Sequence, residues 1–214
     1  IYIGHIPGIG SMALTGVGIA LPVISILSAF AGLFGQGGAP LCSMARGRGD
    51  GDEASRVMGN AFSMLLVSSV ALGLLTWAFL DPAVEVFGAG EEASGYAREY
   101  LAVYLIGTTF SFVSLGMNVY INAQGFATRG MLTVLLGAVS NIVLDPIFIF
   151  AFGMGVRGAA LATVLSQALS AAWCFLFLRS DKTPLELSWR TMAPRKTIMG
   201  RILSLGVADF VMGA

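Results

Sequence analysis

The sequence predicts an all-α protein that crosses a membrane several times. Hydrophobic residues make up 56% of the chain and charged residues only 11%, whereas charged residues make up about 25% of a typical soluble domain. The apolar residues fall in long runs, and about 20 such residues suffice for a helix to cross a bilayer. The formal net charge is zero, so the composition shows no electrostatic footprint of nucleic-acid binding.

Five complete spans are predicted, separated by polar or glycine-rich segments. The segment of residues 1–6 is interpreted as the outer end of a preceding helix. The glycine-rich stretch of residues 35–38 either ends the first span or bends it. The spans are predicted at residues 12–34, 57–80, 94–122, 131–152 and 159–178, and a further helix begins at residue 198.

The polar loop before the second span contains helix-capping residues. Asp50 or Asp52 is expected to cap this span, with Glu53 in its first turn, because acidic side chains accept hydrogen bonds from the free N–H groups there. Asp81-Pro82 is expected to stop the span.

Three tyrosines lie in the early turns of the third span, after an acidic stretch at residues 85–92. Tyr96, Tyr100 and Tyr104 fit an aromatic belt at the membrane surface.

Basic residues fall mostly on one side of the predicted spans. Ten Lys and Arg residues lie on that side, and only Arg98 and Arg157 lie on the other. Because cytoplasmic loops carry the excess of basic residues, the ten-residue side is predicted to face the cytoplasm. The ten are Arg46, Arg48, Arg56, Arg129, Arg179, Lys182, Arg190, Arg195, Lys196 and Arg201.

One ionisable residue, Asp145, interrupts the apolar run of residues 131–152. A carboxylate in hydrocarbon costs at least about 2.5–3.5 kcal/mol, so such residues usually face a bundle interior and mark a transport pathway. Asn141 lies on the same helix face four residues earlier, and Pro146 is expected to kink the helix. The pattern predicts a cation site, with a purely structural hydrogen-bonded cluster as the alternative.

Thr163 is predicted to complete this cluster from the next helix. At 1.5 Å per residue, Asp145 lies about 10 Å and Thr163 about 9 Å from the outer membrane boundary. The two helices are joined by a short turn, so the two side chains are expected at one level. Carboxylate, amide and hydroxyl oxygens suit sodium or a proton relay.

Other chemistry-bearing residues are interpreted as structural. Cys42 and Cys174 are expected near the same membrane face as small apolar residues, not as a disulfide or a metal site. His5 is interpreted as an interfacial residue, and the loop of residues 46–50 as solvated, with gating as its alternative role. The sequence has no HExxH, CxxC or Ser/His/Asp arrangement, so an intramembrane enzyme is disfavoured.

Several segments together resemble the MATE (multidrug and toxic compound extrusion) family of transporters. The resemblance covers essentially the whole chain, and its combination of segments is more specific than any one of them. It rests on residues 3–8, 13–20, 40–43, 45–49, 122–125, 141–146 and 157–163.

The resemblance implies a twelve-helix transporter of two six-helix lobes. Residues 1–178 would form part of the N-terminal lobe, from the end of helix 1 through helices 2–6. Residues 179–197 would form a cytoplasmic connector, and residues 198–214 would start helix 7 of a second lobe. The implied location is the cytoplasmic membrane of a prokaryote, and the second lobe is the implied partner.

The resemblance also implies site residues. Asn141, Asp145 and Thr163 match three residues of the family's first-lobe cation site, and Asn118 resembles a further asparagine of the fourth helix. A first-helix aspartate of that site would lie just before residue 1. The implied coupling ion is H⁺ or Na⁺, with no other cofactor.

The function implied is export of cationic or amphiphilic drug-like compounds in exchange for that ion. Asp145 would attract the drug to a pocket lined with Met and Phe, and Pro146 would act as a hinge. One alternative is a flippase for a lipid-linked sugar, which would need several basic residues for phosphate. The other is a half-length membrane subunit that does not transport by itself.

Overall fold

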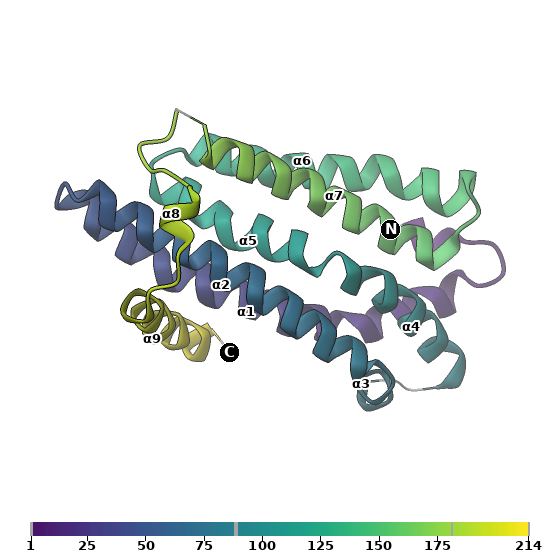
Figure 1. Cartoon of the computed structure of the whole chain (residues 1–214). Helices are drawn as coiled ribbons and strands as arrows, with labels where there is room; N and C mark the ends of the chain where they lie inside the picture. Colours follow the sequence, from purple (N-terminus) through teal and green to yellow (C-terminus); the bar gives the residue numbers. More distant parts are fainter. Residues whose placement is uncertain (1, 88–89, 181, 214) are drawn as a thin grey trace.

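The computed structural model describes residues 2–87, 90–180 and 182–213, and every regular element in these ranges is helical. The expectations for residues 1, 88–89, 181 and 214 lie outside the described residues. The elements are η1 (Tyr2–His5), α1 (Gly10–Gly47), α2 (Gly51–Ala78), α3 (Leu80–Phe87), α4 (Glu91–Ile106), α5 (Thr108–Ala123), α6 (Ala127–Pro146), the π-helical η2 (Ile147–Ala151), α7 (Gly155–Leu178), α8 (Trp189–Met192) and α9 (Lys196–Gly213). Figure 1 shows an elongated bundle with α6 and α7 on one side.

The long helices account for the five predicted spans. Among the described residues, four helical segments are long and apolar enough to cross a membrane: α1, α2, α6 continued by η2, and α7. The fifth candidate is the pair of α4 and α5. A bilayer favours this arrangement because a helix satisfies its backbone hydrogen bonds within itself.

The hairpin formed by α1 and α2 confirms the predicted helix cap and shows that the glycine-rich stretch does not end the first span. α1 continues through residues 35–38 and ends at Gly47, so these glycines do not end the helix. Asp50 caps α2, and its Oδ1 accepts a hydrogen bond from the Glu53 N–H at 2.8 Å.

The second span ends close to the predicted residue 80, but Asp81-Pro82 does not directly follow it as its stop. α2 ends at Ala78, and the two residues lie in the first turn of the short helix α3. Proline is tolerated there because the first N–H groups of a helix have no partner within the helix.

The third span was predicted as one helix and is instead broken at Gly107. α4 and α5 meet at 62° across this residue. A Cβ atom at Gly107 would lie 2.6 Å from the methyl groups of Val164 on α7. Glycine therefore allows the bend to lie directly against the neighbouring helix.

Two of the three tyrosines do not form a surface belt. Tyr100 and Tyr104 are only 7% and 6% exposed, and their rings stack with centroids 6.1 Å apart. Tyr96 is half-buried. This face of α4 points into the bundle, so Tyr100 and Tyr104 pack in its interior.

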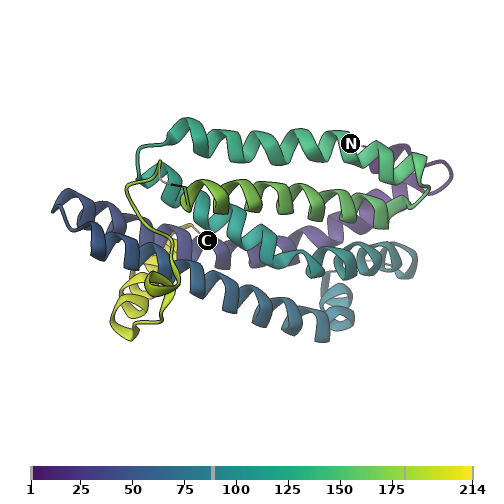
Figure 2. The same cartoon turned by 45° about the horizontal axis from the view of Figure 1, so that its top comes forward.

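The segments that carry most of the basic residues lie together at one end of the bundle. Figures 1 and 2 both show the α1–α2 turn, the α5–α6 link and the connector at that end. The connector is folded: Leu185 and Leu187 are buried, and Ser188 and Thr191 form a capping box at α8. One end of the bundle therefore carries the predicted cytoplasmic loops.

Candidate functional site

Three of the predicted site residues meet between α6 and α7. The Asn141 amide donates to Asp145 Oδ1 at 3.4 Å and to Thr163 Oγ1 at 3.4 Å. The first contact follows from the four-residue spacing on α6. The second requires α7 to pack against α6 with both side chains at one level, as the depth comparison predicted.

A fourth residue, Tyr100 of α4, belongs to the same cluster. Thr163 donates its hydroxyl proton to the Ala159 carbonyl at 3.0 Å, so its oxygen is free to accept. The Tyr100 hydroxyl lies 3.4 Å from that oxygen. Sequence reasoning missed this role because it placed Tyr100 at the membrane surface.

The cluster is half-buried, and Asp145 carries its only carboxylate. Asn141, Asp145 and Thr163 are each of intermediate exposure. The ion pairs between described residues involve other acids, and Asp145 is in none of them. Its charge is therefore met by a neutral amide rather than by a basic side chain, which leaves it able to attract a cation.

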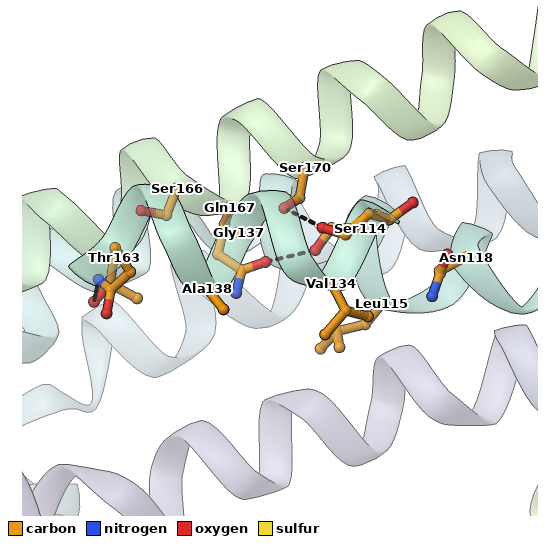
Figure 3. A pocket seen from close by; sticks show the side chains of 12 residues that line it. Ser114, Leu115, Asn118, Val134, Gly137, Ala138, Thr163, Ser166, Gln167 and Ser170 are labelled. Atoms are coloured by element: carbon orange, nitrogen blue, oxygen red, sulfur yellow. Dashed lines mark hydrogen bonds between the residues drawn. The ribbon is translucent and has the colours of Figure 1, made fainter. Parts of the chain in front are cut away.

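A pocket of about 340 Å³ extends from this cluster between α5, α6 and α7. Figure 3 shows the side chains that line it. No Met or Phe lines this pocket within the lobe: eight of its twelve lining residues carry neutral polar side chains and none is charged. The lining residues are Ser114, Leu115, Asn118, Thr133, Val134, Gly137, Ala138, Asn141, Thr163, Ser166, Gln167 and Ser170.

Hydrogen bonds order the middle of the pocket. Ser114 donates to Gln167 Oε1 at 2.5 Å, and Ser170 donates to the Thr133 carbonyl at 3.0 Å (Figure 3). A Cβ atom at Gly137 would lie 2.6 Å from the Ser170 hydroxyl oxygen, so glycine makes room for that hydroxyl.

The sequence contained a signal for this polar wall that the predictions did not use. Residues 163, 166, 167 and 170 are all polar, and their spacing places them on one face of a helix. In an otherwise apolar span, such a face indicates a lining rather than a lipid contact.

Asn118 lies in the same pocket but outside the cluster. A Cβ atom at Gly130 would be 3.2 Å from Asn118 Oδ1. Gly130 precedes Asn141 by eleven residues, or about 16 Å along the helix. Asn118 Oδ1 is buried and has no hydrogen-bond partner in the described part of the chain.

Pro146 marks a change of helical form and not a sharp kink. α6 ends at this residue and the π-helical turn η2 follows, with the Phe152 N–H donating to the Ile147 carbonyl at 2.9 Å. The segment from Ala127 to Ala151 still counts as one span. Such π-turns lie frequently at functional sites, and this one begins directly after Asp145-Pro146.

Known proteins are similar to this chain in both sequence and fold. The family model described as MatE matches residues 1–147. Multidrug export protein MepA of Staphylococcus haemolyticus (strain JCSC1435) is 27% identical over 202 residues, which are 94% of this chain and 45% of MepA. The chain thus spans about half the length of the curated relatives it matches.

Solved structures of transporters match the fold in two conformations. One described as the inward-facing conformation of a multidrug resistance MATE family transporter of the MOP superfamily has a TM-score of 0.90 at 30% identity, covering 96% of this chain and 47% of that one. One described as the outward-facing conformation of such a transporter has a TM-score of 0.88 at 30% identity, covering 98% and 46%. Together with the family match over more than half of the sequence, these structures show that the chain is a multi-pass membrane protein that belongs to the MatE family.

Proposed function

We propose that this chain forms the first lobe of an efflux transporter that exchanges H⁺ or Na⁺ for cationic, drug-like compounds across the cytoplasmic membrane. The lobe would work with a second helical lobe, since relatives named as multidrug export proteins are about twice as long. The similarity to both an inward-facing and an outward-facing structure supports a lobe that keeps its fold while the two lobes move relative to each other.

The observation that carries this proposal is the cluster around Asp145 at the end of a polar pocket. The Asn141 amide lies 3.4 Å from an Asp145 carboxylate oxygen and 3.4 Å from the Thr163 hydroxyl, so amide, carboxylate and hydroxyl groups gather at this point. These are oxygen-bearing groups of the kind that hard cations prefer. The amide donor now lies between the carboxylate and the hydroxyl, and a turn of the Asn141 amide would present its oxygen there instead.

Charge exchange at Asp145 would couple the two fluxes. An ionised Asp145 attracts a cationic compound to the pocket, whose polar wall can hydrogen-bond it. When H⁺ or Na⁺ arrives from outside, the carboxylate is neutralised and its attraction for the compound is lost. The change of helical form after Pro146 gives α6 a place to bend as this happens.

The decisive variant is Asp145→Asn in the two-lobe transporter, reconstituted in vesicles with imposed Na⁺ and pH gradients. Ion-driven drug transport should be lost, because the isosteric amide cannot change charge. Glu92→Gln is the matched control, since it removes a carboxylate from an exposed position in the first turn of α4. Undiminished gradient-driven transport by Asp145→Asn would contradict the proposal.

The pocket lining argues against the flippase alternative. A site for a lipid-linked phosphate would be expected to present Arg or Lys, and none of the twelve lining residues is basic. An enzymatic role is excluded by the family, whose members are transporters.

A further inference from the structure

The structure holds the connector firmly on α2, at the end of the bundle assigned to the cytoplasm. Asn60 is only 1% exposed. Its amide donates to the carbonyls of Thr191 and Ala193, each at 3.2 Å, and its oxygen accepts from the Arg195 N–H at 2.7 Å. Ser63 adds a bond to the Met192 carbonyl at 2.8 Å. The segment just before α9 is therefore tied to the first lobe.

α9 itself packs on α1 through two glycines. A Cβ atom at Gly37 would collide with the Ile202 carbonyl, and a Cβ atom at Gly206 would collide with the Leu33 carbonyl. The two backbones therefore touch at this crossing, and a side chain larger than glycine would push the helices apart. Ile202 is fully buried there.

An exposed ion pair also joins α9 to the neighbouring helix α2. Arg201 of α9 donates to Glu53 Oε1 of α2 at 2.8 Å. The other oxygen of Glu53 accepts from Arg48 at 3.0 Å. Glu53 therefore keeps a basic partner when Arg201 leaves, so opening the contact strands no carboxylate without a counter-charge.

We infer that the Gly37–Gly206 crossing and the Glu53–Arg201 pair form a reversible latch that closes the pathway between the lobes at the cytoplasmic end. The inference rests on the proposed function, because α9 corresponds there to the start of the second lobe. Both members of the ion pair are partly exposed, and exposed pairs are weak enough to break and re-form. The connector on Asn60 acts as the tether that stays bound while α9 moves.

The latch is tested by cross-linking it in the two-lobe transporter. Glu53→Cys with Arg201→Cys, joined by a short reducible thiol reagent, should lower drug transport at least tenfold, and a reductant should restore it. The native Cys42 and Cys174 are fully buried and do not compete for the reagent. Full cross-linking with undiminished transport would overturn the inference while leaving the exporter proposal intact.

A cross-link across the tether is the matched control. Ser63 Oγ donates to the Met192 carbonyl at 2.8 Å, which joins α2 to the connector, and both residues are half-buried. Ser63→Cys with Met192→Cys should therefore cross-link without slowing transport. Inhibition by this pair as well would mean that any restraint at this end stops the protein, and the specific latch would be rejected.

A second readout does not depend on transport. The thiol of Ile202→Cys should react with a membrane-impermeant maleimide only when α9 leaves α1. Labelling should rise several-fold when Glu53→Gln is added and stay unchanged with Arg48→Gln. Likewise Gly206→Ala should raise labelling, whereas Gly200→Ala should not, because a Cβ atom at Gly200 meets nothing within 4 Å. Equal labelling in all these variants would contradict the latch, even in a protein that showed no drug transport.

Discussion

Thr163→Val gives the sharpest test of the ion cluster, because valine keeps the shape and β-branching of threonine and removes only the hydroxyl. The variant loses the contacts from Asn141 and Tyr100, each at 3.4 Å. Interhelical hydrogen bonds in a membrane average about 0.6 kcal/mol, so two of them amount to about 1.2 kcal/mol. Because these contacts hold the cluster in order for the ion, their loss should weaken coupling-ion binding by up to this free energy, which is about eightfold in affinity.

The assay is drug transport in vesicles as a function of the Na⁺ concentration or pH that drives it. The concentration for half-maximal transport should rise about eightfold, while the maximal rate at saturating ion stays close to that of the parent. Thr76→Val, on α2 away from the cluster, is the matched control. An unchanged half-maximal concentration with a reduced maximal rate would refute the reasoning, because it would place Thr163 in drug binding or packing instead.

Three further variants test the surroundings. Tyr100→Phe removes one contact of the cluster, which is worth about 0.6 kcal/mol, and should weaken ion-driven transport about threefold at low ion concentration. An eightfold weakening of transport by this variant would mean that the Tyr100 hydroxyl contacts the ion directly. Gly107→Ala should lower the free energy of unfolding in detergent by about 1–3 kcal/mol, because the added methyl group overpacks the contact with Val164. Adding Val164→Ala should recover most of this loss. No recovery would place the strain in the bend itself. Asn60→Ala should weaken the attachment of the connector to α2 by about 3 kcal/mol, because three hydrogen bonds are lost. Limited trypsin digestion should then cut at Arg195. An uncut connector would show that the buried leucines are sufficient to hold it.

The resemblance and the helix spacing together predicted most of the candidate site. Asn141 and Asp145 share a helix face because of their spacing, and the depth of Thr163 follows from the short turn before α7. Tyr100 could not be assigned this way, because its role depends on the bend at Gly107. A glycine alone does not show where two helices will touch.

The sequence by itself determined the spans, their order and the one acid within the fourth span. In a membrane these are local properties, since each helix satisfies its own backbone and each charge in hydrocarbon needs a reason to be there. Tertiary structure alone decided that the connector lies on Asn60 and that α9 crosses α1 at two glycines. Those contacts join residues more than a hundred positions apart, so they depend on which helices become neighbours, and hydropathy along the chain does not encode that choice.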